Sequence, residues 1–156
     1  MAVKKSKVPD NTICLNKKAG YDFFFLEKYE AGLVLEGWEV KSLRAGKAQL
    51  RDSYVIIKSG EAFLLGSLIT PLSTASTHIS PEQQRTRKLL LHKEQLNTLI
   101  GAVERKGQTI VPISMYWIRG KAKLQIALAK GKKEFDKRDT EKNRDWQREK
   151  ERLFKR

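Results

Sequence analysis

The sequence contains very little cysteine and histidine. Among 156 residues there are one cysteine, Cys14, and two histidines, His78 and His92. A single cysteine excludes an intramolecular disulfide framework, so nothing argues for an oxidising compartment. These residues have none of the spacings that bind zinc, and no serine lies in a Gly-x-Ser-x-Gly motif. We therefore expect no metal site, no cofactor and no catalytic residues, and we predict that the protein is not an enzyme.

Long hydrophobic runs are also missing. The longest stretch without Asp, Glu, Lys or Arg spans residues 62–81, and two prolines with several serines and threonines interrupt it. Such a stretch cannot be a transmembrane helix. The basic residues 1–7 have no apolar segment behind them, so no signal peptide is expected. We predict a cytoplasmic protein that does not bind membranes.

Acidic residues are outnumbered. The chain carries 32 Lys and Arg against 18 Asp and Glu, a formal charge of +14, and 40% of its residues are hydrophobic. That composition is enough for one domain with a core. The excess positive charge indicates a polyanionic partner, and RNA or DNA is the first candidate.

The composition changes near residue 130. Residues 1–130 carry +10 and are predicted to be an RNA-binding domain, whereas residues 131–156 carry +4 and form a basic C-terminal tail. Phe135, Trp146 and Leu153 share one helix face in the tail, but this seam is too thin to pack a core. Pairs such as Lys137–Glu141 support a helix only weakly. We expect the tail to be disordered when free and helical on a partner; a membrane-surface helix is a weaker alternative.

The body is rich in predicted strands. Residues 54–57 and 62–65 form one hairpin around Ser59-Gly60, and residues 109–118 and 122–129 form another around Arg119-Gly120-Lys121. An earlier strand spans residues 21–26 and leads to residues 33–35. A helix is expected near residues 96–103 and a short one near residues 38–43. This order predicts a mainly β protein with helices: a closed or partly open antiparallel barrel of the oligonucleotide-binding type.

The last predicted strand has two different faces. Leu124, Ile126 and Leu128 alternate with Lys121, Lys123 and Gln125. The apolar set is expected to face the barrel interior. The basic set either faces RNA or is simply a solvated surface, and the strand alone does not separate these readings.

Short basic clusters are the other candidate RNA contacts, although any one of them can equally serve solubility. One cluster precedes the first strand at residues 16–18, and the others supply Arg85, Arg87, Lys88, Lys130, Lys132 and Lys133. Trp38 is predicted to be a surface contact on the short helix. Glu36 and Glu39 are expected to pair with Lys41 or Arg44 rather than to act as an acid–base pair. His78 is expected to have a structural role in a loop or, less often, to contact ribose or phosphate.

One continuous segment carries a specific signature. Residues 30–48, EAGLVLEGWEVKSLRAGKA, resemble the bacterial SsrA-binding protein family, also called small protein B. The resemblance continues in DSYV (52–55), GEAF (60–63), ITP (69–71), RTRKLLL (85–91), KGKK (130–133) and DKR (136–138). These matches follow the family order along most of the chain.

The resemblance implies a function. It implies an oligonucleotide-binding-like barrel that binds the tRNA-like domain of transfer-messenger RNA and delivers it to stalled ribosomes for trans-translation. The implied partners are that RNA, small-subunit ribosomal RNA and elongation factor Tu, with the protein acting as a monomer. The tail would reach the decoding centre and the empty message channel. A general RNA chaperone or tRNA-binding barrel is the alternative, followed by an RNA-processing enzyme.

The resemblance also assigns residues. The family's RNA contacts correspond to Glu30, Leu90 and Lys123, of which Leu90 lies in a leucine run that alone suggests core packing. The ribosome-binding tail corresponds to Phe135, Asp136, Lys137 and Arg138, followed by Trp146. Many relatives have His where this chain has Phe135, so stacking is retained there but a hydrogen bond or a protonation-dependent role is not.

Overall fold

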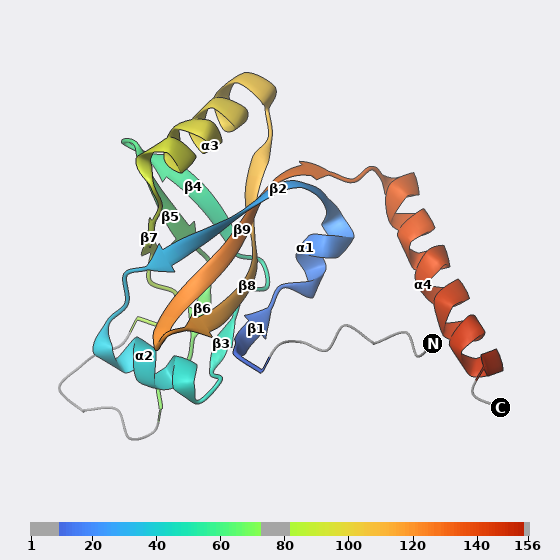
Figure 1. Cartoon of the computed structure of the whole chain (residues 1–156), viewed down its shortest axis with the longest axis horizontal. Coiled ribbons are helices and arrows are strands. Elements are labelled where there is room, and N and C mark those ends of the chain that lie inside the picture. The colour runs from blue at the N-terminus through green and yellow to red at the C-terminus, as the bar shows by residue number, and fades with distance from the viewer. Residues whose placement is uncertain (1–9, 73–81, 155–156) are drawn as a thin grey trace.

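The chain folds into a ring-like antiparallel sheet with helices around it (Figure 1). The computed structural model describes residues 10–72 and 82–154, and His78 lies outside these residues. In chain order the elements are β1 (Thr12–Leu15), α1 (Lys17–Asp22), β2 (Phe23–Leu33), α2 (Gly37–Arg44), β3 (Ala48–Gln49), β4 (Tyr54–Lys58), β5 (Glu61–Leu65), β6 (Leu68–Ile69), β7 (Arg87–Leu90), α3 (Lys93–Lys106), β8 (Thr109–Ile118), β9 (Lys121–Gly131) and α4 (Glu134–Phe154).

The sheet order is β1-β8-β4-β5-β7-β2-β9, and β8 also pairs with β9, which closes the ring. The closure is uneven. Strand β8 meets β4 at one residue pair, Val55 with Ile110, and β2 meets β7 at two pairs. The result is the partly closed antiparallel barrel that the sequence predicts.

Both predicted hairpins are present. Ser59 and Gly60 have φ values of 52° and 74°, and Arg119 and Gly120 have 50° and 75°. Two consecutive positive φ values are the signature of the type I′ turn, whose twist matches that of the flanking strands. These turns fix the registers of β4 with β5 and of β8 with β9.

The first predicted strand is wrong in detail. Tyr21 belongs to helix α1, and β2 begins at Phe23 and continues past residue 26 to Leu33. Helix α1 begins there because the Asn16 side chain accepts a hydrogen bond from the backbone N–H of Ala19 at 3.3 Å. Asn16 also donates to the Pro112 carbonyl at 2.9 Å, a long-range contact that local pattern does not reveal.

A bulge between Phe25 and Glu27 lets β2 serve two hydrophobic clusters. Before the bulge, Phe23 and Phe25 pack with Ala19 of α1 against the small cluster that contains Ala127 and Ala129. After it, Tyr29, Ala31 and Leu33 pack against the main core, the large buried cluster inside the ring. We call the side of the sheet facing away from the main core the outer face.

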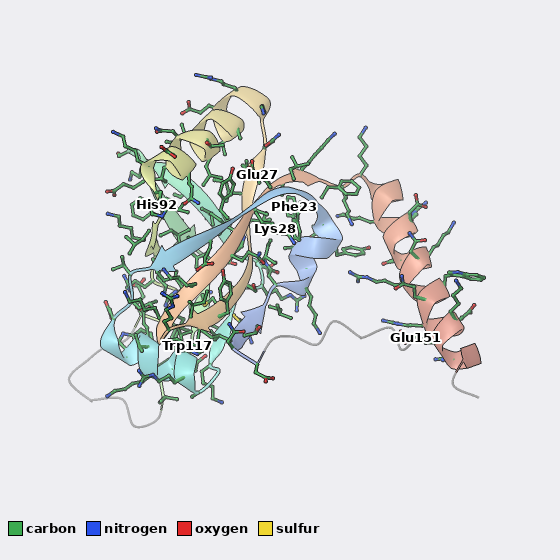
Figure 2. All side chains as sticks on the ribbon, in the orientation of Figure 1. Phe23, Glu27, Lys28, His92, Trp117 and Glu151 are labelled. Atoms are coloured by element: carbon green, nitrogen blue, oxygen red, sulfur yellow. The ribbon has the colours of Figure 1, made fainter. Side chains whose placement is uncertain are left out.

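The main core contains the predicted apolar face of β9. Leu124 and Ile126 are fully buried and Leu128 is nearly so. Leu99 of α3 is also fully buried, and Gly107, with a φ of 63°, ends that helix. Figure 2 places His92, at the start of α3, and Trp117 at opposite ends of the barrel.

The tail is one helix, α4, which extends away from the barrel (Figure 1). Its first turns contact α1: Lys137 Nζ lies 3.3 Å from Asp22 Oδ1, and the Tyr21 hydroxyl donates to Glu141 Oε1 at 2.8 Å. Lys137 and Glu141 therefore contact α1 instead of forming the predicted pair with each other. The described side chains from Arg138 onward are exposed, Trp146 among them. That this helix needs a partner for stability stays a prediction.

None of the helices in residues 10–72 and 82–154 is long and apolar enough to cross a membrane.

Candidate nucleic-acid interface

The outer face of β9 and its neighbours presents an aligned row of side chains. Lys123 lies opposite Tyr116 of β8 on one side and opposite Gly32 of β2 on the other. Gly32 in turn lies opposite Leu90 of β7. The row Tyr116, Lys123, Gly32 and Leu90 therefore crosses four adjacent strands.

A second row lies beside the first. Gln125 is opposite Ser114 of β8 and Glu30 of β2. Because residues two apart on a strand share a face, Glu30 and Gln125 lie on the same outer face as Gly32 and Lys123. The structure thus brings Glu30, Leu90 and Lys123 together from three strands that are far apart in the sequence.

Leu90 lies on the surface. Its exposed fraction is 52%, whereas that of its neighbour Leu89 is 2%, so the leucine run alternates between the outer face and the main core. A Cβ at Gly32 would lie 3.2 Å from the Leu90 Cβ. The missing side chain of Gly32 therefore gives Leu90 its space, and Leu90 covers the sheet beside Lys123.

Glu30 has a partner on the same face. Burial, followed by the negative charge of Glu30 and a hydrogen bond to it, raises the pKa of Tyr116 to about 12. The phenol is therefore protonated at neutral pH and is a hydrogen-bond donor available to the Glu30 carboxylate on the same face. Tyr116 was missed by the sequence reasoning, although the register offered a signal: a two-residue turn at Arg119-Gly120 places Tyr116 opposite Lys123.

The lysines of β9 keep their charge available. Lys121 and Lys130 are exposed and Lys123 is half-buried. Among the residues that the structure describes, no ion pair neutralises any of these three. The outer face consequently combines uncompensated positive charge, an apolar side chain at Leu90 and one oriented carboxylate. Such a face can contact phosphates, stack against sugars or bases, and accept hydrogen bonds.

The prediction that Arg87 contacts RNA is wrong. Arg87 is fully buried. Its guanidinium pairs with Glu39 and donates to the Ser67 hydroxyl and carbonyl at 2.9 and 3.1 Å. A buried guanidinium with this many partners is a structural group.

The two neighbours of Arg87 are also neutralised. Arg85 pairs with Glu39 and Glu36, and Lys88 Nζ lies 3.0 Å from Glu61 Oε1. Residues 85–88 therefore contribute little net charge to the surface, and the expected RNA contacts of Arg85 and Lys88 stay predictions.

The prediction that Trp38 is a surface contact is wrong as well. Trp38 is 7% exposed and belongs to the main core, and its indole N–H donates to Glu36 Oε2 at 2.6 Å. Helix α2 starts at this point because Glu39 accepts a hydrogen bond from the backbone N–H of Glu36 at 2.8 Å, in a capping arrangement. Glu36 and Glu39 pair with Arg85 and Arg87, and not with Lys41 or Arg44 as predicted.

The buried carboxylate of Glu39 is ionised. Burial raises its pKa, but hydrogen bonds from Arg85, from the Glu36 backbone and from Arg87, together with the Arg87 charge, lower it further than burial raises it. The net pKa is below the ordinary value of about 4.5. Glu39 therefore holds both arginines at neutral pH.

The cluster at the junction of body and tail is divided. Lys132 Nζ lies 4.9 Å from the centre of the Phe24 ring and donates to the Gly20 carbonyl at 3.1 Å, so it anchors the chain to α1. Lys130 and Lys133 are exposed. The side chains of Phe135 and Asp136 lie outside the described part of the structure. Arg138 and Trp146 are exposed, the latter by 61%.

Cys14 packs against the main core, as expected for a small hydrophobic residue. Burial raises the pKa of its thiol to about 11, despite a backbone hydrogen bond from Met115 that lowers it. The thiol is therefore protonated at neutral pH.

Comparisons with known proteins agree with one another. A family model described as SmpB protein matches residues 13–156. An SsrA-binding protein of Alkalilimnicola ehrlichii is 59% identical over 97% of this chain and 95% of its own, and one of Albidiferax ferrireducens is 60% identical over 96% and 97%. A solved structure described as "tmRNA-SmpB: a journey to the center of the bacterial ribosome" matches with a TM-score of 0.64 and 45% identity, over 78% of this chain and 85% of that one.

Proposed function

The chain belongs to the SmpB protein family, and from this membership we propose that it is an RNA-binding adaptor of trans-translation. The barrel binds the tRNA-like domain of transfer-messenger RNA and brings it to stalled ribosomes. Helix α4 reaches the decoding centre and the empty message channel. Elongation factor Tu takes part in delivery, and the protein works in the cytoplasm as a monomer without catalysing a reaction itself.

One observation carries the RNA-binding part of the proposal. Glu30, Leu90 and Lys123 are separated by 60 and 33 positions in the sequence, yet they occupy adjacent strands on one outer face. Lys121, which lies two residues before Lys123 on β9 and so shares its face, adds positive charge there. A surface with these groups suits folded RNA, for which phosphate contacts supply affinity and the other groups supply selectivity.

The separate role of the tail is supported by how it is attached. Helix α4 contacts the body through α1, and its described side chains from Arg138 to Arg152 are exposed. An exposed helix with Trp146 and many cations offers ribosomal RNA both a stacking surface and phosphate contacts. The RNA surface of the barrel does not include these residues.

A tail deletion tests this division. The deletion should begin at Glu134, because Lys132 contacts α1 and Gly131 ends β9. We expect the shortened protein to bind the tRNA-like domain with near-normal affinity and to lose peptide tagging on stalled ribosomes. The full-length Lys123→Ala variant is the reciprocal control, because it should lose RNA affinity first. Loss of binding and tagging in equal proportion after the deletion would contradict the two-part adaptor.

The choice of RNA separates the adaptor from a general RNA chaperone. A chaperone would bind the tRNA-like domain and an unrelated hairpin of equal length with equal affinity at the same salt concentration. The adaptor should prefer the tRNA-like domain. RNA cleavage by the pure protein would instead favour an enzyme.

A further inference from the structure

Resting on the proposed RNA site, we propose that Tyr116 is a positioning residue of that site: its phenol crosses β9 and holds the Glu30 carboxylate in place for hydrogen-bond donors of the RNA. Tyr116 makes the surface that recognises RNA extend over four strands, β7, β2, β9 and β8. The RNA groups that such a carboxylate takes are base amino groups and ribose hydroxyls.

The registers set the geometry. Tyr116 is in β8 and Glu30 is in β2, and both strands pair with β9. Tyr116 is opposite Lys123, and Glu30 is opposite Gln125, one step further along the same face. With strands about 4.8 Å apart, β8 and β2 are roughly 10 Å apart, a span that a tyrosine and a glutamate side chain bridge together. To reach Glu30 from this register, the phenol has to cross β9 between Lys123 and Gln125.

The chemistry of the site requires such an arrangement. Glu30 is an acidic residue on the outer face of a body that carries +10, next to Lys123. A free carboxylate beside a lysine would turn toward the ammonium and neutralise it, yet no ion pair joins Glu30 to Lys123 in the described structure. A neutral donor on the opposite side of β9 holds the carboxylate without cancelling the lysine charge. The raised pKa of Tyr116 keeps that donor protonated.

The two ends of the row have different tasks. At one end Leu90, 52% exposed, covers Gly32 and offers an apolar surface. At the other end Tyr116 is partly exposed, and its hydroxyl is the one polar group that its side chain brings to the face. A purely packing role for Tyr116 would need the ring alone, and phenylalanine would then replace it without loss. The hydroxyl is therefore the atom to remove.

The test in free protein uses Tyr116→Phe, with Tyr54→Phe as the matched control. Tyr54 is a 49% exposed tyrosine on β4, away from β9. We expect Tyr116→Phe to shift the side-chain carboxyl carbon resonance of Glu30 in ¹³C NMR of the full chain, and Tyr54→Phe to leave it in place. An unchanged Glu30 resonance in Tyr116→Phe would overturn the proposal, whether or not the protein binds the expected RNA.

The test with RNA is a double-mutant cycle of Tyr116→Phe and Glu30→Gln, measured by anisotropy on the labelled tRNA-like domain. Tyr116→Phe should weaken binding by about 3- to 10-fold with an unchanged salt dependence, because it removes a charge-assisted hydrogen bond and no cation. In the Glu30→Gln background the same change should have little effect. An equal loss in both backgrounds would mean that Tyr116 does not act through Glu30.

The outcomes keep the two proposals apart. If wild-type protein does not prefer the tRNA-like domain over an unrelated hairpin, the proposed function fails, and the NMR measurement still decides whether Tyr116 holds Glu30. If wild-type protein prefers that RNA but Tyr116→Phe binds as wild type does, only the positioning role fails. Equal melting temperatures of Tyr116→Phe and Tyr54→Phe exclude a loss of fold as the cause.

Discussion

Two basic segments of this protein look alike in sequence and differ completely in structure. Residues 85–88 contribute Arg85, Arg87 and Lys88, and β9 contributes Lys121, Lys123 and Lys130. Every cation of the first set is paired with a carboxylate, and Arg87 is fully buried. None of the second set has an ion-pair partner among the described residues. Cations that are close in sequence therefore pair with carboxylates in one case and stay unpaired in the other.

The difference comes from what lies beside each segment. The first segment packs beside α2, which supplies Glu36 and Glu39, and beside β5, which supplies Glu61. Strand β9 lies between β8 and β2, whose outer-face positions opposite Lys123 are Tyr116 and Gly32. The neighbours, and not the number of cations, decide which charges reach the solvent.

The strongest test of this comparison is Arg87→Met, which removes a cation from the first set. It leaves the buried Glu39 carboxylate with Arg85 as its remaining cation and should lower the free energy of unfolding by about 3 kcal/mol. Urea denaturation followed by circular dichroism measures this. The exposed Lys121→Met is the control and should stay within about 0.5 kcal/mol of wild type. A stable Arg87→Met protein that has lost RNA affinity would place Arg87 in the interface after all.

The second test compares one lysine from each set. Lys123→Ala should weaken binding to the tRNA-like domain by about tenfold and reduce the salt dependence by about one counterion. Lys88→Ala, the matched control, removes a lysine that already pairs with Glu61 and should change affinity less than about twofold. Anisotropy titrations at several salt concentrations measure both values. Equal losses for the two variants would remove the distinction between the segments.

The third and smallest effect is a pH dependence of stability that only the first segment should show. The folded-state pKa of Glu39 lies below its ordinary value of about 4.5, so the unfolded chain takes up a proton first as the pH falls. The stability contributed by Glu39 is therefore complete above about pH 4.5 and decreases as the pH falls toward the folded-state pKa, by at most about 1.4 kcal/mol per pH unit.

The matched variant for this measurement is Glu39→Gln, which cannot titrate. It should be less stable than wild type at pH 7, because Arg87 loses its charged partner, and its stability should change less between pH 5 and pH 3. Denaturation at each pH gives both curves. Parallel curves for the two proteins would assign the acid sensitivity to other carboxylates.

Local pattern predicted much of the fold and part of the site. The two hairpins depend on turns of two residues, and the faces of β9 depend on strict alternation, so both are encoded within a few positions. The same alternation correctly predicts that the Lys123 side chain lies on the face away from the main core. The registers across β2, β7 and β9 join strands that are far apart in the sequence, so local pattern does not predict that Glu30, Leu90 and Lys123 share a face. Only the family resemblance names these three residues together.

The errors have a common cause. Arg87 lies 48 residues from Glu39, and nothing near either residue indicates the other. The short, basic helix predicts a surface position for Trp38, yet one face of α2 packs against the main core. Burial of a charge or an aromatic ring at such positions depends on packing against elements that are distant in the sequence.

The uneven closure of the ring has a mechanical consequence. The strands form two halves, β1-β8-β9-β2 and β4-β5-β7, joined by a single residue pair at one seam and by two pairs at the other. Leu90 belongs to one half and Lys123 to the other. An RNA that contacts both residues therefore spans the seam between β2 and β7 and holds the two halves together. Its binding free energy then opposes separation of the halves, and the loaded adaptor becomes the stiffer object.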